Sequence, residues 1–314
     1  MTGVRVRVPA TSANLGPAFD CAGLALTRYD VLEFAVLPSG LEVSVSGIGA
    51  GELPTDGSHL VVRAFRAACE RLGWTPTGLR VTADNAIPQG RGMGSSAAAV
   101  VAGVLGAWAL CPDVDGIDRD AVLRLTTELE GHPDNVAPCL LGGATLSWTT
   151  PEGARAVRLD VAPGIRPVVL VPGTTLSTHV ARGLLPEAVP HADAAFNAAR
   201  SALLVHALTA DPALLFEATD DRLHQRPRSA AMPDSIALID RLRAHGHAAV
   251  VSGAGPSLLV LTHRHPDDED GRPADAVRVR EIAELTPSGW TVLPLEVDVH
   301  GARVLDDTGQ VSSR

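Results

Sequence analysis

The sequence feature that most constrains the fold is a glycine- and serine-rich stretch at residues 88–98, Pro-Gln-Gly-Arg-Gly-Met-Gly-Ser-Ser-Ala-Ala. It follows Gly78–Asp84, whose alternation is typical of a strand, and it precedes Ala99–Leu105, whose small apolar residues are typical of a buried helix. Glycine lets the backbone approach an anion closely, and a helix N-terminus adds positive potential. The pattern predicts a phosphate-binding loop. The structural alternative is a serine-capped core helix after a turn.

Two other motifs are excluded for this stretch. The sequence contains no lysine, so no Walker lysine can exist. Residues 92–96 do not place serine at the centre of a G-x-S-x-G motif. Because a helix dipole contributes only ~0.3–2 kcal/mol, we expect a bound phosphate to use backbone amides, hydroxyls and a metal ion as well.

The composition restricts the class of partner. A chain of 314 residues that is 46% hydrophobic can bury a large core in about two lobes. The net charge of −10 disfavours binding to nucleic acid or to an anionic membrane, so an anionic ligand needs local arginines. No apolar run could span a bilayer and no apolar leader precedes the first strand, so we expect a soluble, cytoplasmic protein. The four cysteines lack CxxC spacing, which favours free thiols: Cys21, Cys69, Cys111 and Cys139.

Hydrophobic periodicity predicts alternating strands and helices along the whole chain. In Val4–Val8, valine and arginine alternate, so we expect the valines to face a core. We expect a turn-rich loop at Pro9–Asp20 and a helix that Asp118 caps. Further strands are expected at Tyr29–Val36, Leu41–Ser46, Arg166–Val171 and either side of the glycine turn in Val250–Leu261, and further helices at His59–Leu72, Ser177–Leu185 and Ala192–Thr209.

Five separated segments together resemble the GHMP kinase superfamily: Pro9–Asp20, Pro88–Ala98, Glu130–Gly143, Ser177–Arg182 and Ser252–Pro256. The resemblance implies a two-lobed α+β fold. An N-terminal lobe of ribosomal-S5-like character would cover residues 1–155, a C-terminal lobe of ferredoxin-like character residues 156–305, and a tail residues 306–314. Within the superfamily the chain is similar to the branch that transfers the γ-phosphoryl of ATP to the side-chain hydroxyl of L-homoserine. That reaction yields O-phospho-L-homoserine for threonine biosynthesis.

The resemblance also implies a nucleotide and metal site. Mg²⁺ prefers oxygen ligands, and the implied ligands are Ser96 and Glu130, with Glu128 as the alternative to Glu130. His59 stands where relatives commonly carry an asparagine that contacts nucleotide, and an imidazole can still form one such hydrogen bond. The implied ATP-binding residues of the loop are Pro88, Gln89, Gly90, Arg91, Gly92, Met93, Gly94, Ser95, Ser96, Ala97 and Ala98.

L-Homoserine is a zwitterion, so its site must hold an ammonium group and a carboxylate. By resemblance, Asp20 is the ammonium partner and Asn14 a hydroxyl or amino contact. Arg182 and Arg228 would contact the carboxylate and the transferring phosphate, because a guanidinium forms paired charge-assisted hydrogen bonds. His132 lies in the substrate segment. The structural alternative for Asn14 and Asp20 is an Asx-turn.

The resemblance leaves the catalytic base open. Asn135 and Thr178 would orient the acceptor hydroxyl and a phosphate oxygen would take its proton, with Arg182 also catalytic. A loose transition state tolerates this arrangement. Asp134 or His132 as base is the alternative.

Two rival functions and the assembly state stay open at this point. The chain could be another GHMP kinase of a small alcohol, or a non-catalytic ATP-binding sensor on the same fold. The presence of Ser96, Glu130 and Arg182 argues against the sensor. The sequence does not determine the oligomeric state, for which a homodimer is one candidate.

Overall fold

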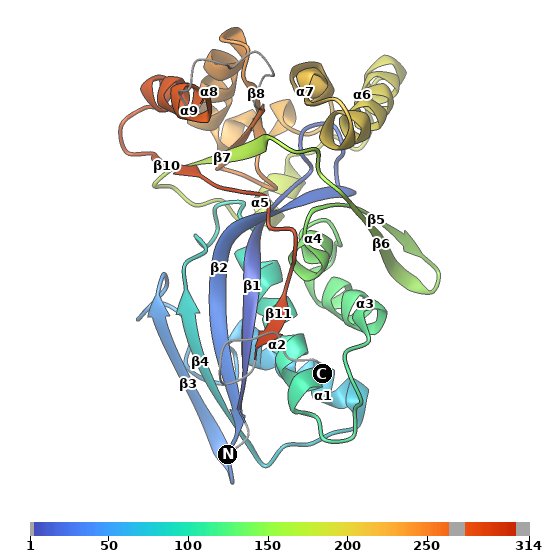
Figure 1. The fold of residues 1–314 in the computed structure, drawn as a ribbon, viewed down its shortest axis with the longest axis vertical. Coiled ribbons are helices and arrows are strands. Elements are labelled where there is room, and N and C mark those ends of the chain that lie inside the picture. The colour runs from blue at the N-terminus through green and yellow to red at the C-terminus, as the bar shows by residue number, and fades with distance from the viewer. Residues whose placement is uncertain (1–2, 264–273, 306–314) are drawn as a thin grey trace.

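The computed structural model describes residues 3–263 and 274–305, and it shows two lobes that are each built around a β-sheet (Figure 1). The sheet of the N-terminal lobe has the order β11-β1-β2-β4-β3. Strand β5 also pairs with β2, and β6 pairs with β5. Only β3 and β4 pair in parallel; the other pairs are antiparallel. Its strands are β1 (Gly3–Ala13), β2 (Ala22–Val36), β3 (Gly40–Gly47), β4 (Gly78–Asn85), β5 (Ala144–Thr150), β6 (Gly153–Leu159) and β11 (Arg303–Leu305).

Helices cover one face of this sheet (Figure 1). Helix α2 is apolar on all sides and packs between α1 and the sheet, so its small residues lie in the core as the sequence predicted. Helix α3 begins after Asp118, whose carboxylate accepts the N–H of Ala121, which confirms the predicted cap. The helices of this lobe are α1 (Leu60–Leu72), α2 (Ser95–Leu110), α3 (Arg119–Glu130) and α4 (Val136–Leu141).

The C-terminal lobe has a four-stranded sheet of order β10-β7-β9-β8, in which β7, β8 and β9 are largely buried and β10 is a partly exposed edge strand. Val168 and Leu170 of β7 pack with residues of α8, whereas Val169 and Val171 join the larger core. The strands are β7 (Ile165–Val171), β8 (Ala248–Val251), β9 (Leu258–His263) and β10 (Thr291–Pro294). The helices are α5 (Thr178–Gly183), α6 (His191–Thr209), α7 (Leu215–Ala218), α8 (Pro233–Ala244) and α9 (Ala274–Leu285), with 3₁₀ turns at Pro212–Leu214 and Arg226–Ala231.

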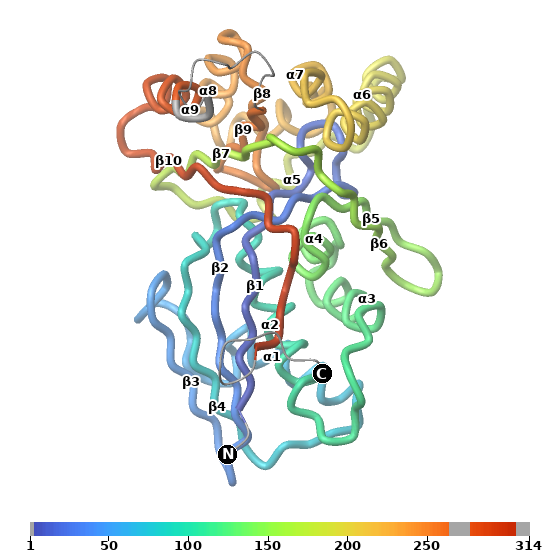
Figure 2. Tube along the Cα trace, in the orientation of Figure 1, coloured from blue at the N-terminus to red at the C-terminus, as the bar shows by residue number. Residues whose placement is uncertain are grey.

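The chain crosses between the lobes more than once (Figure 2). After β10 it returns to the first sheet, where β11 pairs with β1. The predicted lobe boundary between residues 155 and 156 falls inside β6, which pairs along its whole length with β5. The predicted tail, 306–314, lies outside the described residues.

The sequence prediction was right for the alternation in the first strand and wrong for the segment after it. Val6 and Val8 are fully buried, whereas Arg5 pairs with exposed Glu33. The segment from Pro9 to Ala13, expected as a loop, is the second half of β1. The pairing register with β2 shifts between Pro9 and Ala10, and such a bulge accommodates a proline that has no N–H to donate.

The predicted two-lobed α+β fold is confirmed. Among the residues that the structure describes, no helix is long and apolar enough to cross a membrane. All four cysteines are free thiols.

Candidate active site

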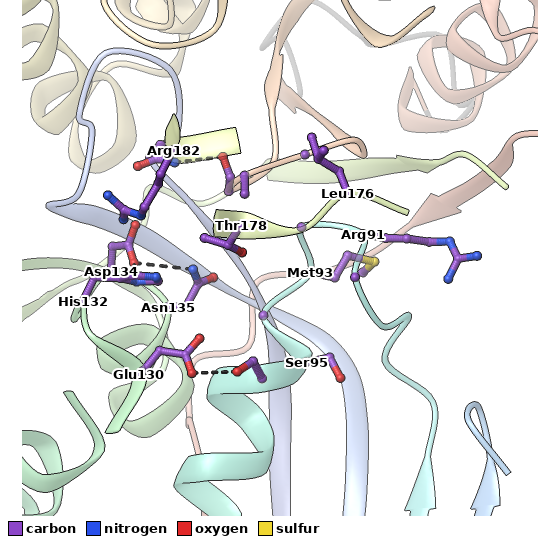
Figure 3. Close-up of a pocket in the computed structure, with 18 of the residues that line it drawn as sticks. Arg91, Met93, Ser95, Glu130, His132, Asp134, Asn135, Leu176, Thr178 and Arg182 are labelled. Carbon is purple, nitrogen blue, oxygen red and sulfur yellow. Dashed lines mark hydrogen bonds and ion pairs between the residues drawn. The ribbon is translucent and has the colours of Figure 1, made fainter. Parts of the chain in front are cut away.

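One cavity lies between the glycine loop, the turn after α3, helix α5 and the loop at residues 253–255 (Figure 3). These elements are far apart in the sequence and come from both lobes. Most of the predicted site residues line this cavity: Asn14, Pro88, Gly90, Arg91, Gly92, Met93, Gly94, Ser95, Ser96, Glu130, His132, Asn135, Thr178, Arg182 and Arg228.

The glycine loop leads into α2 without a side-chain cap. Gly94 is the N-cap residue, with φ 70°, and no side chain in the described part of the chain caps the first-turn amides. The serine-capped alternative is therefore not what the structure has, and the helix N-terminus opens toward the cavity. A Cβ on Gly94 would lie 1.9 Å from Oγ1 of Thr11, and one on Gly92 would lie 2.1 Å from the carbonyl oxygen of Ser252. Glycine is required here by close crossings of other segments as well as by backbone conformation.

Not every residue of the loop offers its side chain to the cavity. The guanidinium of Arg91 donates to the carbonyl oxygens of Gln89, Pro172 and Gly173 at 3.0–3.1 Å, and Figure 3 shows it on the side away from Glu130. The side chains of Ala97 and Ala98 are fully buried in the core. Arg91 therefore anchors the loop to the chain after β7.

A second, mainly apolar cavity of about 300 Å³ adjoins the first and shares Gly90, Ser95 and Ser96 with it. Gln89 and His59 also line it. His59 caps α1: its Nδ1 accepts the N–H of Val61 at 3.3 Å, so the ring hydrogen lies on Nε2. That Nε2 is buried and has no hydrogen-bond partner among the described residues. Burial lowers the pKa of His59, which keeps the ring neutral.

The two predicted metal ligands contact each other. Ser96 Oγ donates to Glu130 Oε2 at 2.7 Å (Figure 3). Burial raises the pKa of Glu130, and the bond from Ser96 opposes that shift. Glu128 instead pairs with Arg71 at 2.9 Å on the exposed side of α3. No cluster of three or more His, Cys, Asp or Glu side chains in the described ranges could hold a metal by itself, so a metal would also need ligand oxygens and waters.

Asp20 and Arg182 form a two-pronged ion pair. The guanidinium nitrogens of Arg182 donate to the two carboxylate oxygens of Asp20 at 2.9 and 2.6 Å. This hydrogen bond raises the pKa of Arg182. Both side chains are about one-third exposed, at 34% and 36%. The charges expected to recognise the two ends of a substrate are therefore paired with each other in this structure.

Arg228 has a different environment. It is 1% exposed, its Nε donates to the carbonyl oxygen of Ala181 at 3.3 Å, and one terminal nitrogen lies 3.1 Å from Nδ1 of His224. Burial and the nearby Arg182 lower the pKa of Arg228. Among the described residues it has no carboxylate within ion-pair distance. A buried cation without an ion pair, on the wall of a cavity, favours an anionic ligand.

Both polar atoms of the Asn14 side-chain amide form hydrogen bonds with other protein groups. Its Oδ1 accepts the N–H of Asp20 at 2.9 Å, and its Nδ2 donates to the carbonyl oxygen of Gly253 at 2.9 Å. Asn14 and Asp20 both have positive φ values, 71° and 58°. The bond to Asp20 closes a loop of six residues, whereas an Asx-turn bonds to the N–H two residues on, so it is not the Asx-turn considered as a structural alternative. The bond to Gly253 connects the two lobes.

The turn after α3 brings three more polar side chains to the cavity (Figure 3). Nδ1 of His132 lies 2.6 Å from a carboxylate oxygen of buried Asp134, and this bond raises the pKa of His132. Asn135 Oδ1 accepts from Thr11 Oγ1 at 2.8 Å. Thr178, the first residue of α5, lines the same cavity.

Several contributors were not predicted. Thr11 lay in the segment misread as a loop. The ring of Phe19 lies beneath the guanidinium groups of Arg182 and Arg228. Its centroid is 5.4 Å from the guanidinium carbon of Arg182 and 5.3 Å from that of Arg228. Because only 3% of the chain is aromatic, a phenylalanine in a loop of small polar residues was a usable signal. His224 carried no sequence signal.

Comparison with known proteins gives the family to which this two-lobed fold belongs. A model of the GHMP kinases N terminal domain matches residues 59–143, and one of GHMP kinases C terminal matches residues 199–281. The first of these spans the glycine loop and the turn after α3. The chain is thus built as a GHMP kinase.

Relatives narrow the class further. The chain is 52% identical to a homoserine kinase of Streptomyces avermitilis over 96% of this chain and 95% of that protein. It is also 52% identical to one of Clavibacter michiganensis over 96% of this chain and 93% of that protein. A crystal structure of homoserine kinase from Cytophaga hutchinsonii superposes with a TM-score of 0.84 at 25% identity, covering 97% of this chain and 98% of the other. The chain belongs to the homoserine kinase family.

Proposed function

We propose that the chain transfers the γ-phosphoryl group of ATP to the side-chain hydroxyl of L-homoserine. The observation that carries the proposal is one cavity with two different ends. At one end the uncapped N-terminus of α2 offers backbone amides for phosphate. At the other end lie Arg228, which is buried and has no ion pair among the described residues, and Arg182, which pairs with Asp20; this combination of charges suits a zwitterion.

The nucleotide would span the two adjoining cavities. Its phosphates would lie along residues 90–96, and the apolar cavity beyond them would take the base. His59 supports this placement, because its buried Nε2–H has no hydrogen-bond partner in the described part of the chain. A nitrogen or oxygen acceptor on the nucleotide would satisfy that donor.

A magnesium ion would be held by Ser96 and Glu130 together with phosphate oxygens and waters. The donor set fits, because Mg²⁺ takes one or two protein oxygens beside substrate phosphates, and these two oxygen-bearing side chains lie 2.7 Å apart. When bound, the ion would neutralise charge on the transferring phosphoryl group. We favour Glu130 over Glu128, which is engaged by Arg71 outside the cavity.

Recognition of L-homoserine would require an exchange of ion pairs. Arg228 is placed to take the carboxylate. The substrate ammonium group would replace Arg182 at Asp20. The released guanidinium would then contact the carboxylate or the transferring phosphoryl group, where paired charge-assisted bonds are strong.

The acceptor hydroxyl would be oriented by Asn135 and Thr178, which both line the cavity. His132 has Nδ1 engaged by Asp134, so only its Nε2 is available to substrate. The proton would pass to a phosphate oxygen, which a loose transition state allows. The alternative in which His132 or Asp134 takes it stays open.

The test is ATP turnover by the purified chain with a panel of acceptors: L-homoserine, L-threonine, L-serine, mevalonate and galactose. We expect the highest kcat/KM with L-homoserine, and a phosphate monoester of it detected by ³¹P NMR. Preference for a neutral or carboxylate-only acceptor would favour another small-alcohol kinase. ATP binding without turnover of any acceptor would favour the sensor.

A further inference from the structure

The acceptor end of the cavity is the part proposed to bind the acceptor, where Arg228 and the Asp20–Arg182 pair lie. His224 contacts both the loop that carries Asp20 and the side chain of Arg228. It lies between α7 and the 3₁₀ turn at Arg226–Ala231, and it is 1% exposed. Its Nε2 is 2.6 Å from the carbonyl oxygen of Gly16, in the loop that carries Asp20. Its Nδ1 is 3.1 Å from a terminal nitrogen of Arg228. One imidazole therefore contacts both the proposed ammonium end and the proposed carboxylate end.

The two contacts determine the protonation state of the ring. A guanidinium nitrogen can only donate, so Nδ1 of His224 must accept from Arg228. A carbonyl oxygen can only accept, so the hydrogen must lie on Nε2, which donates to Gly16. The ring is thus a neutral imidazole with one defined tautomer. Burial and the charge of Arg228 lower the pKa of His224, against the opposing effects of Asp221, Gly16 and Asp20.

The surroundings hold His224 in this orientation. The carboxylate of Asp221 accepts the backbone N–H groups of Leu223, His224 and Gln225 at 2.9–3.1 Å, which fixes the segment. The imidazole also packs on Phe19, with 5.0 Å between ring centroids. The same phenyl ring lies beneath Arg228.

The orientation of the Arg228 guanidinium depends on His224. Its other hydrogen bonds to protein are longer, at 3.3 Å to the carbonyl oxygen of Ala181 and 3.4 Å to that of Gly253. A buried guanidinium in such surroundings can rotate unless a closer acceptor fixes it. Only the 3.1 Å contact with Nδ1 of His224 meets that need in the part of the chain that the structure describes.

We propose that His224 is a positioning residue that sets the distance between the ammonium and carboxylate contacts of an α-amino-acid substrate. Its neutral imidazole couples the carbonyl of Gly16 to the guanidinium of Arg228. Its role is to select acceptors that carry both charges on one carbon. The inference rests on the proposed function, because it assumes that Arg228 binds the substrate carboxylate.

Two substitutions separate the contacts. In His224→Gln, the amide nitrogen can still donate to Gly16, but no acceptor remains for Arg228. In His224→Asn, the amide oxygen can still accept from Arg228, but the bond to Gly16 is lost. The measured quantity is the carboxylate ratio, defined as kcat/KM for L-homoserine divided by kcat/KM for 3-amino-1-propanol, which lacks only the carboxylate.

We expect His224→Gln to lower the carboxylate ratio about tenfold, since hydrogen bonds to charged groups have effects of this order, with the KM for ATP unchanged. His224→Asn should lower kcat/KM for both acceptors and keep the ratio near that of the wild type. In an Arg228→Met background, His224→Gln should have no further effect on the ratio.

An unchanged carboxylate ratio in His224→Gln, whether kcat/KM stays the same or falls equally for both acceptors, would overturn the positioning role while leaving the proposed function intact. A wild-type protein that does not phosphorylate L-homoserine would overturn the proposed function, and this inference with it. Retention of the KM for ATP reports that each variant is folded.

Discussion

The phosphate end of the cavity is built from one continuous segment, whereas the acceptor end is assembled from side chains that are distant in the sequence. In the proposed function, residues 90–96 would form the phosphate end through backbone amides at the start of α2. The acceptor end would use Asn135, Arg182 and Arg228, which line the cavity, and Asp20, which is paired with Arg182; these residues come from four different segments. Backbone N–H groups cannot hydrogen-bond to one another, because each can only donate. Oppositely charged side chains, in contrast, can form ion pairs. Asp20 and Arg182 are paired with each other, so in the proposed function the acceptor end would exchange partners when substrate binds.

This contrast predicts that the phosphate end is preformed and that the acceptor end rearranges. Variants at the phosphate end should therefore act on ATP and on turnover. Variants at the acceptor end that alter charge recognition should act mainly on the KM for L-homoserine. The predictions that follow test this division, beginning with the largest expected effect.

The largest effect is expected for Glu130→Gln, where the two ends meet. Loss of a metal ligand removes several kcal/mol of charge stabilisation, so kcat should fall about 100-fold or more and the Mg²⁺ requirement should rise. Steady-state kinetics across a magnesium titration would measure both. Glu128→Gln is the matched control and should behave like the wild type, because Glu128 contacts Arg71 outside the cavity. A greater loss in the control would move the metal site to the other face of α3.

The next effect is expected for Asp20→Asn. The variant loses the ammonium partner and releases Arg182 from its ion pair. Truncating one member of a desolvated charge pair costs ~2–5 kcal/mol; because both side chains are about one-third exposed, we expect the lower end of this range, a rise of ~30-fold in the KM for L-homoserine. The KM for ATP should change little. Wild-type affinity for L-homoserine in this variant would show that the amino group is recognised elsewhere.

Gly94→Ala tests whether the phosphate end is preformed by its backbone. The new Cβ would collide with Thr11 Oγ1 and would strain a residue with φ 70°. A local strain of ~1–3 kcal/mol should raise the KM for ATP about tenfold. Gly116→Ala is the control, since Gly116 has φ 93° but no atoms within 4 Å of its added Cβ. Equal effects of the two substitutions on ATP would mean that backbone strain anywhere, and not the crossing at Thr11, limits binding.

The smallest effect concerns the bond between His132 and Asp134. Because this bond raises the pKa of His132 above 6.5, its stabilisation is complete below the unfolded-state pKa and is lost as pH rises through the folded-state pKa. Replacing His132 by glutamine should therefore lower the free energy of unfolding by about 1 kcal/mol more at acidic than at alkaline pH. Urea denaturation at pH 5.5 and pH 8.5 would measure the difference. A pH-independent difference would mean that the imidazole is not charged in the folded protein.

Much of the fold could be predicted because its signals are local. The alternation of Val4–Val8, the cap at Asp118 and the glycine loop before α2 each act within a few residues. The misread segment Pro9–Ala13 shows the limit of such signals. Its proline and small polar residues are typical of a loop, but pairing with β2 after a bulge makes it a strand.

The sequence by itself determined the glycine loop, the two-lobed class and most of the side chains that line the cavity. Only the tertiary structure decided how those side chains use their charges. Asp20 and Arg182 are 162 residues apart in the chain, yet they form an ion pair. Arg228 is buried beside a histidine and not beside a carboxylate. Local sequence patterns reach over a few residues, whereas the pairing and burial of charges depend on which distant segments the fold brings together.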